Sequence, residues 1–147
     1  ADFGFTRVAA EEGDEAMLQQ RGTLPYMAWE LFHDPPLPAT AAALAAVDVC
    51  ALGRVISEAA SGRVPWEGGS EALVRQAVMS GDLPPGLFDA EIDDIPPGME
   101  RAELRGPLGE LVRRCCQEDR RQRPGAGEVR AEVEAIINLL EGGEEKA

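Results

Sequence analysis

Asp2 is the residue best suited to chemistry at the start of this chain, where it stands directly before Phe3 and Gly4. A glycine lets the backbone turn sharply, and a carboxylate on such a turn can bind a metal ion that bridges phosphate groups. The alternative is an ordinary loop or helix-capping aspartate, which is the usual place of Asp near Gly. Residues 2–4 therefore form a candidate metal and phosphate site, with Asp2 as the metal ligand.

Four further motifs follow Asp2 along the chain. They are Gly22-Thr-Leu-Pro-Tyr-Met-Ala-Trp-Glu30, Asp48-Val-Cys-Ala-Leu-Gly53, Ser61-Gly-Arg-Val-Pro-Trp-Glu67 and Cys116-Gln-Glu-Asp-Arg-Arg-Gln-Arg-Pro124. In this order and at this spacing they resemble the motifs that follow Asp-Phe-Gly in protein kinases. The chain resembles the C-terminal lobe of a eukaryotic-type Ser/Thr protein kinase domain, in the style of the tyrosine-kinase-like group.

The resemblance implies a protein kinase-like fold, which is α+β when complete, and a mainly α-helical C-terminal lobe for this chain. Residues 1–142 would be a partial kinase domain, with the activation segment over 2–30 and the helical lobe over 31–142, and residues 143–147 a flexible tail. The sequence has no Gly-rich loop, no lysine in a V-A-I-K context and no H-R-D-x-x-x-x-N loop. We therefore expect a fragment without the ATP-binding lobe and the catalytic loop, which is inactive alone.

The resemblance also implies which residues bind ligands. Asp2, Phe3 and Gly4 would contribute to the binding of ATP and Mg²⁺, with Asp2 on the metal and the other ATP contacts in the missing N-terminal half. Thr23 and Tyr26 would line the pocket for the protein substrate, and the threonine favours Ser/Thr specificity.

Three residues would be structural. Glu30 and Arg123 would form a buried ion pair that ties the activation segment to the helical lobe, because an arginine fork suits a bidentate carboxylate contact. Asp48 would lie at the start of a buried helix and hold the backbone of the catalytic loop. The alternatives are two surface charges for Glu30 and Arg123, and simple helix capping for Asp48.

Three positions depart from the kinase pattern. Trp29 replaces the proline of Ala-Pro-Glu, Cys50-Ala51 replaces the usual aromatic-Ser pair, and Arg120 replaces the proline of the last motif. These departures weaken the inference of activity more than the inference of fold.

The implied function is that of a protein serine/threonine kinase, which transfers the γ-phosphate of ATP to hydroxyl groups of a protein substrate. The alternatives are a pseudokinase and a helical protein-interaction scaffold without catalysis. The presence of the catalytic-loop aspartate and the strand lysine upstream of residue 1 would separate these functions.

The composition limits the classes of partner that this chain can bind. Hydrophobic residues make up 44% of the 147 residues and charged residues 28%, as in soluble globular proteins, and no apolar run reaches the length of a membrane span. The net charge of −13 disfavours nucleic acid and anionic membrane surfaces. Cys50, Cys115 and Cys116 suit buried free thiols in a reducing, cytoplasmic compartment. More than half of the basic residues lie between Arg101 and Arg130, where we expect them to pair with carboxylates of the fold.

Hydrophobic periodicity and breaker residues predict the elements, and no strand is among them. The predictions are an exposed loop through Arg21, a short helix over 28–33, a buried helix from 49 to 60 that ends at Gly62, a helix from Ser70 to Gly81, an acidic loop over 82–106, a helix from Pro107 to Cys116, and a last helix from Pro124 to Gly142.

Overall fold

The computed structural model describes residues 16–85 and 102–144. Its elements in chain order are the 3-10 turns η1 (Leu24–Tyr26) and η2 (Trp29–Phe32), the helices α1 (Ala41–Ser61), α2 (Glu71–Met79) and α3 (Ala102–Cys115), the 3-10 turn η3 (Arg120–Gln122) and the helix α4 (Ala126–Glu144). Within these ranges the only β pairing is an isolated antiparallel bridge between Met17 and Pro38. The prediction of a mainly helical chain is confirmed for this part of the molecule.

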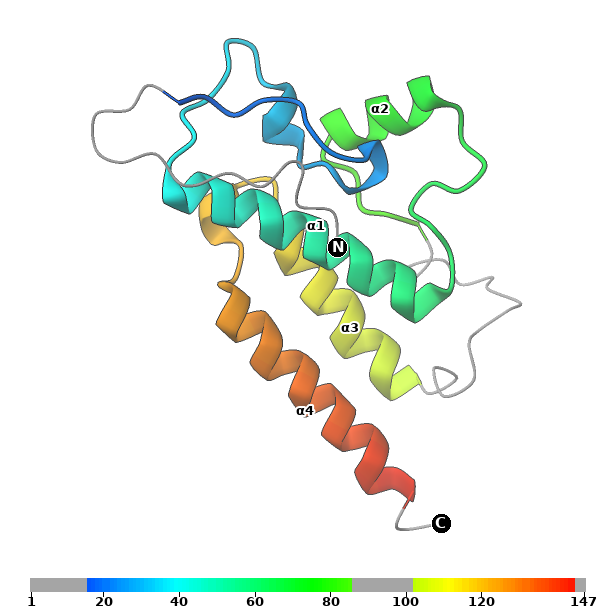
Figure 1. The fold of residues 1–147 in the computed structure, drawn as a ribbon. Coiled ribbons are helices and arrows are strands. Elements are labelled where there is room, and N and C mark those ends of the chain that lie inside the picture. Colours follow the sequence, from blue (N-terminus) through cyan, green and yellow to red (C-terminus); the bar gives the residue numbers. More distant parts are fainter. Residues whose placement is uncertain (1–15, 86–101, 145–147) are drawn as a thin grey trace.

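The helices α1, α3 and α4 lie next to one another and form a layer, while η1, η2 and α2 gather on the other side of α1 (Figure 1). The helix α1 packs chiefly on α3, and α2 packs on the two 3-10 turns. The main core lies between these elements and is made of apolar residues from α1, α3 and α4, among them Val49, Leu111, Val112 and Val129. The two 3-10 turns and α2 thus lie on the opposite side of α1 from α3 and α4 (Figure 1).

The helix α1 begins eight residues earlier than the sequence predicted. Thr40 caps it, since its Oγ1 accepts a hydrogen bond of 3.1 Å from the N–H of Ala43. The alanine-rich stretch that follows, predicted as a connection, continues the helix because alanine has the highest helix propensity. The C-terminal end agrees with the prediction: Gly62 has a φ of 70° and donates its N–H to the carbonyl of Glu58 at 2.8 Å.

The start of the helix α3 also differs from its prediction. It begins at Ala102, so Pro107 lies inside the helix and not at its first position. Ala, Glu, Leu and Arg at residues 102–105 are good helix formers, and a proline close to a helix N-terminus costs only one intrahelical hydrogen bond. The predicted loop over 82–106 is therefore wrong for its last residues; its residues 86–101 lie outside the described ranges.

The helices α2 and α4 follow their predictions more closely. Ser70 caps α2 by accepting a hydrogen bond of 3.3 Å from the N–H of Leu73, as its position predicted. The helix α4 runs to Glu144, two residues beyond the predicted end at Gly142, so residues 143 and 144 are helical and not part of a tail. The short helix over 28–33 is present as the 3-10 turn η2.

Residues 16–39 form a loop whose two ends are joined. Leu18 donates its N–H to the carbonyl of Leu37 at 2.7 Å, and Ala39 donates to the carbonyl of Ala16 at 2.8 Å. Leu18 is only 3% exposed and packs with Ala39 and Ala43. The prediction of an exposed loop through Arg21 is therefore wrong at Leu18, whose apolar side chain is the reason for the burial.

Carboxylates of the fold pair with four arginines of α3, η3 and α4, namely Arg113, Arg114, Arg121 and Arg130, as expected. Arg114 forms salt bridges with Glu128 and Glu132. Three further pairs are Arg113–Glu110, Arg121–Asp119 and Arg130–Glu134. The Arg114 salt bridges join α3 to α4, whereas the other three pairs are local in sequence.

Candidate functional site

The centre of the site is an ion pair between Glu30 of η2 and Arg123, which follows η3. Arg123 Nη1 lies 2.5 Å from Glu30 Oε1, and Arg123 Nη2 lies 3.0 Å from Glu30 Oε2, across 93 residues of sequence. The two side chains are 1% and 0% exposed. This is the buried, bidentate pair that the resemblance implies, and the alternative of two surface charges is wrong.

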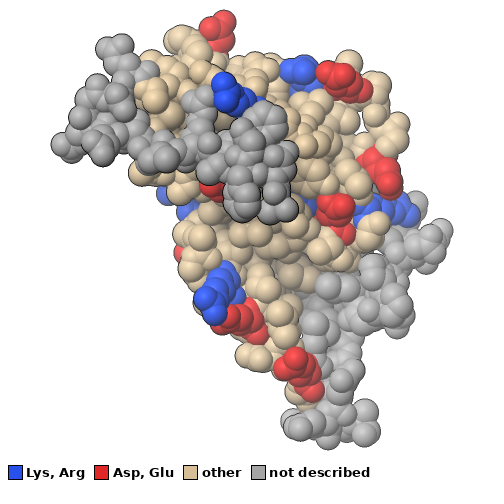
Figure 2. Space-filling view, viewed as in Figure 1, with Lys and Arg blue, Asp and Glu red and all other residues tan. Residues whose placement is uncertain are grey.

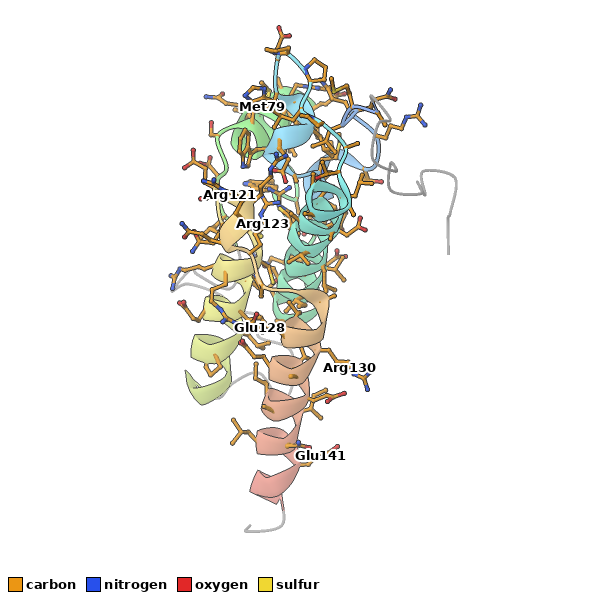
Figure 3. All side chains as sticks on the ribbon, turned by 90° about the vertical axis from the view of Figure 1, so that its left-hand side faces the viewer. Met79, Arg121, Arg123, Glu128, Arg130 and Glu141 are labelled. Carbon is orange, nitrogen blue, oxygen red and sulfur yellow. The ribbon has the colours of Figure 1, made fainter. Side chains whose placement is uncertain are left out.

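Every nitrogen of the Arg123 guanidinium has an acceptor. Nη1 also donates to the carbonyl of Ala46 in α1 at 2.8 Å, and Nε donates to the carbonyl of Gln117 at 2.9 Å. Burial acts to lower the pKa of Arg123, but the hydrogen bond to Glu30 and the nearby charges outweigh it and the pKa is raised. Arg123 therefore stays charged and joins η2, α1 and the end of α3 at one point, which Figure 3 shows at the junction of η3 and α1.

Trp29 makes a second link beside this ion pair. Its indole N–H donates to the carbonyl of Glu118 at 2.9 Å. Its ring also lies 6.1 Å from the ring of His33, measured between centroids. The tryptophan that stands in place of the expected proline thus attaches η2 to the segment between α3 and η3.

Thr23 and Tyr26 lie around one cavity of about 360 Å³, together with Asp48 of α1. Its other lining residues, most of them apolar, include Met17, Leu18, Gln19, Arg21, Met27, Leu31, Leu44 and Val47. The structure therefore brings together two predicted substrate-pocket residues and one predicted structural residue.

Tyr26 is fixed by Glu58, a residue that the sequence reasoning missed. The Tyr26 hydroxyl donates to Glu58 Oε2. This hydrogen bond, with burial and the carboxylate charge, raises the pKa of Tyr26 to about 12. Glu58 lies four residues before Gly62 on α1, and a carboxylate on a mostly apolar helix was the signal that could have identified it.

Asp48 does not cap a helix, and this prediction is wrong. Since α1 begins at Ala41, Asp48 lies inside the helix, where its side chain is exposed. It lines the cavity around Thr23 and also a larger one of about 610 Å³ between α1 and the start of α4. Its carboxylate is therefore accessible from both cavities.

Arg54 is the second functional candidate that the sequence reasoning missed. It is 2% exposed on α1, and its Nη1 donates to the carbonyls of Met27 and, at 3.4 Å, of Pro25. Its guanidinium carbon lies 5.2 Å from the centroid of the Trp66 ring. The signal in the sequence was a charged residue at a position of α1 that the helical period turns toward the core.

The three cysteines are free and buried, as predicted. The Cys116 thiol lies 3.8 Å from the carbonyl of Cys50. A hydrogen bond between the Cys116 and Cys50 side chains, distinct from the contact with the carbonyl, lowers the pKa of Cys50, and the guanidinium groups of Arg54 and Arg123 act in the same direction against burial. The same contact raises the pKa of Cys116, and burial raises that of Cys115 to about 11.

Asp2, Phe3 and Gly4 lie outside the described residues, so the structure does not place the predicted metal and phosphate site. Within residues 16–85 and 102–144, no three His, Cys, Asp or Glu side chains gather in a way that could hold a metal ion. In the same ranges, none of the helices has both the length and the apolar character that a membrane crossing requires. A comparison with protein-family models finds no match to the chain.

Proposed function

We propose that this chain is the helical part of a protein serine/threonine kinase domain. It would contribute the activation segment, the pocket for the protein substrate and one ligand of Mg²⁺ to the transfer of the γ-phosphate of ATP to a protein hydroxyl. The motifs that would supply the phosphate-binding lysine and the catalytic base are not present in the 147 residues. Alone, the chain is expected to be inactive, because positioning and charge stabilisation supply nearly all of the rate.

The observation that carries the proposal is the pairing of Glu30 with Arg123. The resemblance implies this pair from two motifs, and the two residues meet with both carboxylate oxygens bonded to the guanidinium. A buried ion pair is costly unless its geometry is good and its remaining donors are satisfied. Arg123 meets both conditions. The ion pair therefore supports the proposal that the segment with Glu30 has a fixed, functional position against the helical core.

The cavity around Thr23, Tyr26 and Asp48 supports the same function. The proposal needs a substrate pocket beside the place where the catalytic loop lies, and Asp48 would hold that loop through its backbone N–H groups. Asp48 has an exposed carboxylate in the middle of a helix that is otherwise apolar on this side. A carboxylate at such a position is suited to receive N–H donors from a further segment of the protein.

The metal and ATP contacts rest on the sequence alone. Asp2 would bind Mg²⁺, whose charge would stabilise the phosphate oxygens during transfer. Phe3 and Gly4 would shape the turn that presents this carboxylate. The described residues would orient the protein substrate and keep the segment after Asp2 in place.

The test of the proposal is phosphate transfer by the intact protein that contains this chain. Radiolabelled ATP and a mixed peptide library are supplied with Mg²⁺, and the unchanged protein is compared with Asp2→Asn. We expect label on Ser or Thr, and a loss of at least about a hundredfold in Asp2→Asn. Asp34→Asn, at an exposed position away from the cavity, is the matched control. A protein that binds ATP but transfers no label would be a pseudokinase.

A second candidate function, a helical binding scaffold without catalysis, is favoured by the solvent face of α1. From Ala42 onward its exposed residues recur at intervals of three and four, and all but Asp48 are apolar: Ala41, Ala42, Ala45, Asp48, Leu52, Val55 and Ala59. Leu52 is 38% and Val55 is 49% exposed. We call this row of exposed residues the seam of α1. Its spacing is typical of a helix that packs on a partner, because the row stays on one face of the helix.

Under the kinase proposal, this seam would be covered by the parts of the domain that the 147 residues do not contain. Figure 2 shows this side of the molecule, with acidic and basic side chains spread over its described part. Leu52→Glu separates the two functions. If the seam is covered within the domain, the intact protein loses both its fold and its activity. The scaffold function would be favoured if the unchanged intact protein is folded but transfers no phosphate, and if Leu52→Glu leaves it folded.

A further inference from the structure

Arg54 is a buried cation in the middle of the α1 helix. The described residues provide no carboxylate partner for it, since none of the ion pairs includes Arg54. Its contacts are the carbonyls of Pro25 and Met27 and the face of the Trp66 ring, and its Nε is buried without a hydrogen-bond partner. A buried charge with these contacts alone is expensive for the fold.

The position does not require an arginine for packing. The neighbouring core positions on α1 are filled by small or apolar residues such as Cys50, Ser57 and Ala60. An apolar side chain of similar length, such as methionine, would fill the same volume without the desolvation cost. What methionine lacks is the ability to donate hydrogen bonds to the loop over 23–27.

The backbone of Trp66 is a second, independent indication that the position of Arg54 has a function. Its φ is 55°, in the left-handed region that a bulky residue rarely adopts. Trp66 packs in the cluster that contains Met27, Val74 and Val78, and it presents its ring to the Arg54 guanidinium. A cation–π contact of this kind offsets part of the cost of burying the charge.

The structure assigns to Arg54 the role of a positioning residue for the substrate pocket. It holds the carbonyls of Pro25 and Met27 against α1, while Glu58, one helical turn later, holds the Tyr26 hydroxyl. The loop between Thr23 and Met27 is therefore fastened to α1 through both its backbone and its side chain. Because the two residues lie on one face of a rigid helix, they fix the shape of the pocket wall. That this wall binds a protein substrate rests on the proposed function.

The first experiment measures the loop in the 147-residue chain and does not depend on activity. Amide hydrogen exchange is followed for Tyr26 and Met27, whose N–H groups donate to the carbonyls of Thr23 and Leu24. We expect Arg54→Met to reduce their protection about tenfold, the loss of roughly one good hydrogen bond, while protection in α3 is unchanged or higher. Arg54→Lys, which can donate to one carbonyl, should fall between the two.

The control is Arg75→Met. Arg75 lies over an aromatic ring as Arg54 does, with its guanidinium carbon 5.6 Å from the Phe32 ring, but its hydrogen bonds go to Gln20 and Glu71 and not to residues 23–27. It should leave the Tyr26 and Met27 amides unchanged. Equal exchange in Arg54→Met and the unchanged chain, or an equal loss of protection in the loop and in α3, would overturn the assignment. If Arg54→Met does not fold, the same two outcomes are read from Arg54→Lys.

The second experiment connects the loop to substrate binding in the intact protein. Arg54→Met should raise KM for the peptide about tenfold with KM for ATP unchanged, because only the peptide wall is altered. Equal changes in both values would overturn the positioning role. Absence of any phosphate transfer in the unchanged protein would refute the proposed function, and hydrogen exchange would still decide whether Arg54 holds the loop.

Discussion

Gly53 of α1 faces Cys115 of α3 so closely that a Cβ atom added to Gly53 would lie 2.5 Å from the Cβ of Cys115. The same atom would lie 3.2 Å from the Cys116 sulfur. Real Cβ contacts do not come this close, so only glycine permits the present separation of the two helices. Gly53 is part of the kinase-like motif in the sequence, and its role here is close packing between two elements of the core.

Gly53→Ala is expected to destabilise the chain. The added methyl would force α1 and α3 apart, which costs about 1–3 kcal/mol and exceeds the gain of about 1 kcal/mol in helix propensity. Urea unfolding followed by circular dichroism measures the change. Gly127→Ala in α4 is the control, since a Cβ there meets nothing within 4 Å and should cost no stability. A Gly53→Ala chain as stable as the unchanged chain would show that the helices can separate freely.

Glu30→Gln should be far more damaging than the loss of a surface carboxylate. It leaves the Arg123 charge buried without a counter-charge, which costs about 3–5 kcal/mol of unfolding free energy. Glu134→Gln breaks the Arg130–Glu134 pair, whose side chains are 80% and 57% exposed, and should cost at most about 1 kcal/mol. Figure 3 shows Arg130 pointing away from the bundle, in agreement with this difference. The two free energies come from denaturant unfolding, and similar values would contradict the buried role of Glu30.

The hydrogen bond of Tyr26 should make the unfolding free energy of the chain fall as the pH rises in the alkaline range. Its pKa is raised from 10.0 to about 12, so the folded chain keeps the hydroxyl proton that the unfolded chain loses first. The contribution is complete below pH 10 and is lost as the pH rises through 12. Tyr26→Phe should cost about 1–2 kcal/mol at pH 8 and remove this part of the pH dependence. Unfolding midpoints between pH 8 and pH 12 measure both effects, and identical pH profiles for the two chains would contradict the Tyr26–Glu58 bond.

The cysteine contact predicts one acidic thiol. Cys116 stabilises the Cys50 thiolate by hydrogen bonding, so the pKa of Cys50 lies below its usual range. Cys116→Ala should therefore raise the pKa of Cys50, whereas Cys115→Ala should leave that titration in place. Thiolate absorbance in the ultraviolet during a pH titration of the folded chain follows the change. If the most acidic thiol keeps its pKa in Cys116→Ala, the hydrogen bond is not its cause.

The sequence predicted those parts of the fold that depend on local rules. Thr40 and Ser70 both cap helices, but only Ser70 was recognised, because it stands just before an amphipathic pattern. The stretch after Thr40 is almost all alanine, which has no period and was taken for a connection. Pro107 was placed at a helix start because proline favours that position, whereas one lost hydrogen bond near the N-terminus of α3 is tolerated.

Those site residues that belong to two recognisable motifs could be predicted from the sequence. Residues whose contacts join two elements without such a motif could not. Glu30 and Arg123 were paired from the resemblance. Arg54 and Glu58 were not found, since their partners are a loop backbone and a tyrosine hydroxyl, and no spacing rule joins such groups. Asp48 was expected at a helix start, with simple capping as the alternative, and its true position inside α1 depends on where that helix begins.

The joined ends of residues 16–39 have a consequence for movement. The bonds between Leu18 and Leu37 and between Ala16 and Ala39 close this stretch into a ring, and Ala39 directly precedes the Thr40 cap of α1. A force that acts at Ala16 is therefore transmitted through Ala39 to the first turn of α1 and bypasses the loop that bears Thr23 and Tyr26. The loop over 23–27 is thereby shielded from a force that acts at Ala16.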